Sequence, residues 1–154
     1  MTEFGKKVMA FGTFDILHLG HVKLLTNAKK VGGKNAKLIV IVARDQNVIK
    51  EKNRKPVFPE SQRLEMIKAL KVVDEAYLGN LGEDKLKIIE KIRPDIIVLG
   101  YDQNIKENEI YQELKKRGLT PKIKRLEKYG NESFNSSSKI IKRVMEKFAD
   151  ENNH

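Results

Sequence analysis

Residues 8–31 read as a short strand, a glycine turn and a helix in that order, and this restricts the fold more than any other stretch. Residues 8–11 form an apolar run of the length typical of a buried strand. Gly12 interrupts the run, and residues 13–19 lack helical periodicity, so we expect a loop there. Beyond it the apolar residues recur as on one helix face, at Val22, Leu25, Ala28 and Val31.

Strand-like and helix-like segments continue to alternate along the rest of the chain. Apolar runs predict four more strands, the last at a sheet edge, at residues 37–43, 72–78, 95–100 and 121–126. Apolar residues at helical spacing predict helices that begin at Pro59, near Leu86, at Glu107 and at Ser136. Residues 44–58 read as a long polar loop that carries a basic segment.

Five strands that alternate with helices predict an α/β fold, a Rossmann-like open parallel five-stranded sheet with helices on both faces. We expect a single domain over residues 1–148 and a disordered C-terminal tail at 149–154. In such sheets ligands bind beyond the carboxyl ends of the strands, where residues 12–21 and the loop after Gly100 would meet. We expect the last helix, residues 136–148, to turn these apolar residues inward: Ile140, Ile141, Val144 and Phe148.

Composition excludes several classes of protein. The chain of 154 residues has no cysteine, so it forms neither disulfides nor thiolate metal sites. It has no apolar run near the roughly 20 residues that span a bilayer, nor the apolar N-terminal segment of a signal peptide. We therefore expect a cytoplasmic protein with no membrane partner. The net charge of +10 suits phosphorylated ligands, whereas interleaved acidic residues and an aromatic content of 6% disfavour nucleic acid.

Two of the three histidines, His18 and His21, stand where the first helix is expected to begin. Free backbone N–H groups and the helix dipole favour an anion at that end. Imidazoles there can donate hydrogen bonds to a phosphate, and Gly20 between them lets a ligand approach the backbone closely. The plainer alternative is two ordinary polar residues at a helix start, since a bare H-x-x-H spacing is a weak motif.

Other polar residues admit both a structural and a functional interpretation. The serines at 136–138 are favoured helix N-caps, and their hydroxyls also suit phosphate. Asp102 either caps the following helix or contacts a nucleotide, and Asp15 either orders its turn or binds a metal ion. The basic segment is either a solvated loop or a phosphate clamp, and it contains Lys50, Lys52, Arg54 and Lys55. The chain contains neither a P-loop nor a G-x-G-x-x-G motif.

Two motifs together resemble those of the cytidylyltransferase-like nucleotidyltransferases: G-T-F-D-x-x-H-x-G-H at residues 12–21 and S-S-S-K-I at 136–140. The resemblance implies that His18, His21 and Arg63 are catalytic and that the basic segment closes over the phosphates. It implies that the nucleotide is bound by Thr13, Phe14, His18, Leu19, Gly20, His21, Asp102, Tyr129, Ser136, Ser137 and Ser138. No metal ligand is expected from the protein itself, and Mg²⁺ or another divalent ion would accompany the nucleoside triphosphate.

Within that superfamily the chain is most similar to the archaeal-type FAD synthases. The segments that carry this likeness are L-I-V-I-V-A-R-D at 38–45, R-K-P-V-x-P-E-x-Q-R at 54–63 and D-I-I-V-L-G-x-D-Q at 95–103. The likeness implies that FMN and ATP form FAD and pyrophosphate, although CTP stays open as the nucleotide. Tyr129 and Phe134 would either line a slot for the flavin ring or pack against the last helix.

Two other functions stay open. One is a cytidylyltransferase that acts on glycerol 3-phosphate or a phosphorylated sugar. Glycerol-3-phosphate cytidylyltransferases carry an arginine-threonine-x-glycine segment before the serine run, and the N-E-S-F at residues 131–134 departs from it. The other is a nucleotide- or RNA-binding protein without catalysis. A homodimer is compatible with each of the three.

Overall fold

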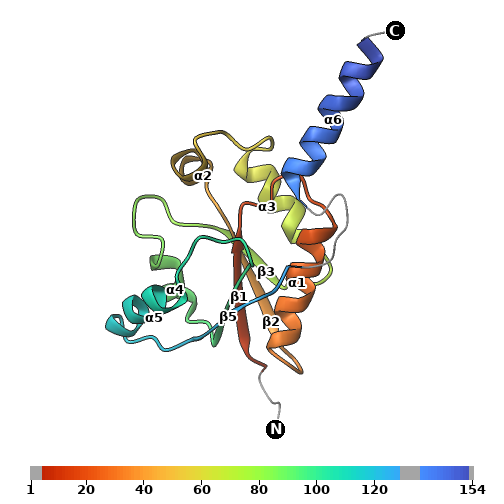
Figure 1. The fold of residues 1–154 in the computed structure, drawn as a ribbon. Coiled ribbons are helices and arrows are strands. Elements are labelled where there is room, and N and C mark those ends of the chain that lie inside the picture. Colours follow the sequence, from red (N-terminus) through yellow and green to blue (C-terminus); the bar gives the residue numbers. More distant parts are fainter. Residues whose placement is uncertain (1–4, 129–135, 153–154) are drawn as a thin grey trace.

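The computed structural model describes residues 5–128 and 136–152, which form one parallel sheet with helices around it (Figure 1). The strand order is β3-β2-β1-β4-β5, and every pair is parallel, which confirms the predicted fold class. The strands are β1 (Lys7–Gly12), β2 (Lys37–Val42), β3 (Glu75–Leu78), β4 (Ile96–Leu99) and β5 (Lys122–Arg125). The helices are α1 (Leu19–Val31), α2 (Asp45–Lys52), α3 (Glu60–Lys68), α4 (Lys87–Ile92), α5 (Glu107–Lys116) and α6 (Ser137–Asn152).

Each face of the sheet carries its own apolar core. Successive side chains of a strand point to opposite faces, so Val8 and Ala10 join one core while Met9 joins the other. The first core packs against Leu25 of α1 and Ile67 of α3. The second core packs against α4 and α5, which lie on the opposite side of the sheet in Figure 1. Burial on both faces is the physical reason why the strands read as continuous apolar runs.

The strand order reverses at β1, which lies between β2 and β4. From β1 the chain goes to α1 on one face, and from β4 it goes to α5 on the other. The two connections diverge at the carboxyl edge of the sheet, and an open α/β sheet binds its ligands at such a point. Among the described residues, no helix is both long enough and apolar enough to cross a membrane.

The prediction of a loop over residues 44–58 is wrong in part, because α2 occupies most of it. Only one residue of α2, Val48, is buried, so the sequence shows no apolar periodicity there. Asp45 in the first turn and lysines in the last complement the helix dipole, and Asn53 ends the helix in a left-handed conformation. Charge and capping, rather than an apolar face, therefore define this helix.

The predicted inward face of the last helix is wrong for Val144 and Phe148, whereas Ile140 and Ile141 are half-buried. No residue of α6 is buried, and Val144 and Phe148 are 48% and 62% exposed. Figure 1 shows α6 projecting from the body of the protein. The apolar spacing correctly indicates a helix but cannot show whether another element covers it. The helix continues through Asn152, where the sequence predicts a disordered tail from residue 149.

Candidate active site

A cavity of about 1230 Å³ opens at the carboxyl edge of the sheet. Segments far apart in the sequence line it, including the turn after β1, the end of α2, the loop after β4 and the start of α6. These predicted site residues lie on its wall: Thr13, Phe14, Gly20, His21, Lys52, Arg54, Lys55, Asp102, Ser136, Ser137 and Ser138. The wall does not include His18, Leu19, Lys50 or Arg63. Tyr129 and Phe134 lie outside the described residues.

The two histidines form a stacked pair at the start of α1. Their ring centroids are 3.8 Å apart, and the backbone N–H of His18 donates to Nδ1 of His21 across 3.4 Å. Since Nδ1 of His21 accepts, its ring proton belongs on Nε2, which can donate to a ligand. Nδ1 of His18 is buried, and no hydrogen-bond partner for it is found among the described residues.

Both imidazoles are neutral near pH 7. Burial lowers the pKa of His21 from 6.5 to about 3, with smaller contributions from His18 and Lys52. Burial also lowers the pKa of His18. His21 therefore contributes a hydrogen-bond donor rather than a positive charge, and the nearby positive charge comes from the basic segment.

The low pKa of His21 predicts a loss of stability in mild acid. Between about pH 6.5 and pH 3 the unfolded chain binds a proton at this residue and the folded chain does not. The free energy of unfolding should therefore fall as the pH is lowered from about 7 to about 4.5, above the range of most carboxyl groups. Urea unfolding measures this, and His21→Asn should flatten the dependence. An equal slope in the variant would show that His21 is not the group responsible.

The ring of Phe14 packs against the imidazole of His21. The Phe14 ring is buried and meets the imidazole edge-on, with the centroids 5.4 Å apart. Gly12 makes this possible, because a Cβ at that position would lie 2.7 Å from the Phe14 ring. Gly12 and Phe14 of the G-T-F segment therefore form the surface on which the imidazole of His21 packs. Phe14 therefore both lies on the cavity wall and packs against the imidazole of His21.

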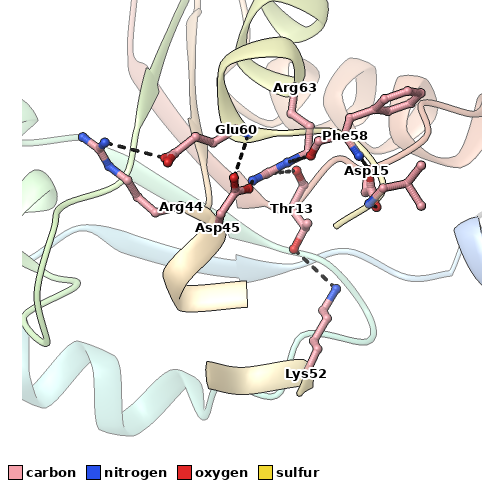
Figure 2. Close-up of polar contacts among 9 residues, drawn as sticks. Thr13, Asp15, Arg44, Asp45, Lys52, Phe58, Glu60 and Arg63 are labelled. Carbon is pink, nitrogen blue, oxygen red and sulfur yellow. Dashed lines mark hydrogen bonds and ion pairs between the residues drawn. The ribbon is translucent and has the colours of Figure 1, made fainter. Parts of the chain in front are cut away.

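Asp15 orders the turn between β1 and α1. Its two carboxylate oxygens accept from the backbone N–H groups of Val57 (2.6 Å) and Phe58 (2.9 Å) (Figure 2). Its backbone carbonyl accepts from the hydroxyl of Ser137 across 2.6 Å. One residue therefore joins the histidine turn, the end of the basic segment and the start of α6. Within residues 5–128 and 136–152, no group of three or more acidic or histidine side chains could hold a metal ion.

Arg63, which the family resemblance implies is catalytic, lies behind the wall of the cavity. Its side chain is fully buried in α3, and its guanidinium donates in three directions. The acceptors are the carbonyl of Phe58 (3.0 Å), the carbonyl of Thr13 (2.7 Å) and the carboxylate of Asp45 (2.7 Å). Figure 2 shows the guanidinium between these groups. In this arrangement Arg63 holds three segments of the site together and does not face the ligand space.

Three of the four basic side chains predicted to close over phosphates reach the cavity: Lys52, Arg54 and Lys55. Lys52 also donates to the hydroxyl of Thr13 across 3.4 Å, which ties the end of α2 to the histidine turn. Lys50 instead forms an ion pair with Glu83 at 3.6 Å, and its side chain is 70% exposed. The turn of α2 places Lys50 and Lys52 on different sides of the helix, which the interpretation as a loop could not show.

The sequence did not single out Gln103, which joins the ends of β1 and β4. Its side-chain amide donates to the carbonyl of Phe11 (3.0 Å) and accepts from the N–H of Gly100 (2.8 Å). Arg125 was missed as well, although it donates to the carbonyls of Gly100 and Gln103. Both residues hold the loop that carries Asp102. For Gln103, the available sequence signal was its position at the end of D-I-I-V-L-G-x-D-Q, residues 95–103, which resembles the archaeal-type FAD synthases.

Comparison with known proteins supports the same assignment. A family model described as cytidylyltransferase-like matches residues 9–143. Curated proteins named FAD synthase are 53% identical over 139 residues in Methanobrevibacter smithii and 54% identical over 143 residues in Methanothermus fervidus. These alignments cover 90% of both chains in the first case, and 92% of this chain and 97% of the relative in the second.

A solved structure from Thermoplasma volcanium, described as a lipopolysaccharide core biosynthesis protein, is 46% identical and has a TM-score of 0.76. It matches 82% of this chain and 99% of its own. A second structure, from Archaeoglobus fulgidus and of unknown function, shares the fold with a TM-score of 0.64 at 21% identity. The family match spans most of the sheet and both motifs of the site, so this chain belongs to the cytidylyltransferase-like family.

Proposed function

We propose that this protein is a nucleotidyltransferase that moves AMP from ATP to FMN, which forms FAD and releases pyrophosphate. The observation that carries the proposal is one shared cavity that holds His21, the basic end of α2 and the serines of α6. The names of relatives more than half identical over 90% or more of the chain support the choice of FMN as the acceptor.

The transfer needs positioning and charge stabilisation more than covalent chemistry. A phosphate oxygen of FMN attacks the α-phosphorus of ATP, the bond from that phosphorus to the bridging oxygen breaks, and pyrophosphate leaves with the bond electrons. The Nε2–H of His21 is suited to donate to an α-phosphate oxygen as charge develops there. Ser137 and Ser138 lie on the cavity wall at the start of α6. The hydroxyl of Ser137 already donates to the carbonyl of Asp15, so the hydroxyl of Ser138 is the one suited to the outer phosphates.

A divalent ion fits this site as a companion of the triphosphate rather than as a resident of the protein. The carboxylate of Asp15 is occupied by two backbone N–H groups, and the described residues contain no metal-binding cluster. Mg²⁺ commonly binds through substrate phosphates and keeps several waters. Bound in this way, it would neutralise phosphate charge, while Lys52, Arg54 and Lys55 supply further positive charge from the wall.

Several narrower points belong to the same proposal. We assign residues 1–148 to the nucleotidyltransferase domain and place the protein in the cytoplasm without a membrane partner. A homodimer stays a prediction. The alternative is a cytidylyltransferase acting on glycerol 3-phosphate or a phosphorylated sugar, and the N-E-S-F sequence at 131–134 counts against glycerol 3-phosphate.

The test is to incubate the protein with FMN and Mg²⁺ and with either ATP or CTP. We expect a flavin dinucleotide and pyrophosphate in equal amounts, detected by chromatography and a coupled phosphate assay, and the faster nucleotide identifies the base preference. Consumption of glycerol 3-phosphate while FMN stays unchanged would replace FMN as the acceptor and keep the transferase. Binding of nucleotide without release of pyrophosphate from it, whichever acceptor is added, would show a protein without this catalysis.

A further inference from the structure

The wall of the cavity has two chemically different parts. One part is formed by α1, the end of α2 with the residues after it, and the start of α6, and it carries the imidazole, the basic groups and the hydroxyls already described. The other part lies on the side of α4 and α5, where a group of aliphatic side chains stands beside Lys106, Glu109 and Glu113. We call this group the aliphatic wall, and it consists of Ile41, Leu86, Ile89, Ile105 and Ile110.

The aliphatic wall is continuous with the second core. Ile41 of β2 and Ile89 of α4 belong to that core, and Leu86, Ile105 and Ile110 are partly buried against it. The sheet, two helices and the loop after β4 each contribute to the wall. Ile41 and Ile89 are buried, so Leu86, Ile105 and Ile110 supply the exposed part of the wall. Apolar side chains that face a cavity favour an apolar group there, since water solvates them poorly.

Transfer of phosphoryl groups makes no use of this surface. The polar part of the wall already supplies the groups suited to the triphosphate. The cavity, at about 1230 Å³, is also larger than the roughly 300–1,000 Å³ of a pocket for one small molecule. The size therefore suits two substrates side by side, one of which has a large apolar portion.

We propose that the aliphatic wall binds the isoalloxazine ring of the acceptor and directs its phosphate toward His21; the assignment rests on the proposed function. A flat aromatic ring loses little conformational entropy on binding and gains from burial between aliphatic side chains. Asn80 and Lys85 lie on the cavity wall beside Leu86, where Asn80 donates to the carbonyl of Asp84 and Lys85 pairs with Glu51. Each side chain has further N–H groups that can donate to the polar edge of the ring. A small polyol phosphate would leave the aliphatic wall uncovered.

Leu86→Asn and Ile110→Asn test this assignment. Both side chains are only partly buried, and Leu86 is the N-cap of α4, where asparagine is a favoured residue. Leu64→Asn is the matched control, because Leu64 is partly buried against the other core and is not on this cavity wall. Thermal melts verify that each variant folds.

The first readout is flavin binding without turnover. FMN and lumiflavin, which has the ring but no phosphate, are titrated by quenching of flavin fluorescence. We expect Leu86→Asn and Ile110→Asn each to weaken both flavins by about tenfold, the effect of one lost apolar contact, and Leu64→Asn to leave them unchanged. Equal affinities in the wild type and both wall variants would overturn the assignment.

The second readout separates the two substrates. We expect the KM for FMN to rise by about tenfold in the wall variants, with the KM for ATP unchanged. A rise in the KM for ATP alone would assign the aliphatic wall to the nucleotide base and overturn the proposal. If the wild type forms no FAD yet binds lumiflavin through this wall, the proposed function fails while the ring site stands.

Discussion

His21→Ala should lower kcat by a factor on the order of 10²–10³ and weaken ATP binding only a few-fold. The reason is the placement of Nε2, which carries the ring proton because Nδ1 accepts from the backbone of His18. A neutral donor on the cavity wall gains most when charge builds on the phosphate oxygens in the transition state. Steady-state kinetics with FMN and ATP, together with equilibrium binding of a non-hydrolysable ATP analogue, measure the two effects.

The same direction is expected for His18→Ala, whose ring stacks on that of His21 at 3.8 Å. Lys30→Ala is the control, since this residue lies in the last turn of α1, far along the helix from the histidines. Near-normal turnover in both histidine variants would disprove the catalytic assignment. An equal loss of kcat and of ATP affinity would instead indicate ground-state binding.

The sequence predicted the structure correctly where a residue pattern has a single structural explanation. Strands buried on both faces must be apolar throughout, so β2 and β4 could be recognised directly. The histidine turn and the serine run could be placed together because the carboxyl ends of parallel strands meet at one edge. The cavity wall brings them together as expected.

The sequence was less informative where one pattern has several causes. Helix α2 is held by caps and charges and buries only Val48, so no apolar spacing revealed it. The apolar residues of α6 recur at helical spacing, so the sequence predicted that they are buried. Spacing alone does not show whether another element covers them, and no residue of α6 is buried. Gln103 bonds to backbone groups of Phe11 and Gly100, and such contacts leave no constraint that a single sequence shows.

Arg63 is the clearest case, and its two interpretations make opposite predictions. An arginine at the start of a helix beside a basic segment suits a phosphate ligand, but the structure places its guanidinium against three protein acceptors. Arg63→Ala should therefore lower the free energy of unfolding by about 1–3 kcal/mol, because it leaves two part-buried carbonyls without a donor and the part-exposed carboxylate of Asp45 without its ion pair. Urea denaturation measures this change.

Lys68→Ala in the same helix is the control, because that side chain is 49% exposed and should change stability by no more than about 0.5 kcal/mol. Arg63→Lys should recover only part of the loss, since one ammonium group cannot replace a planar fork that reaches Phe58, Thr13 and Asp45. If Arg63 instead bound phosphate, the Arg63→Ala variant would be as stable as the wild type and would bind the triphosphate more weakly. That result would mean that Arg63 leaves its three acceptors when the nucleotide binds.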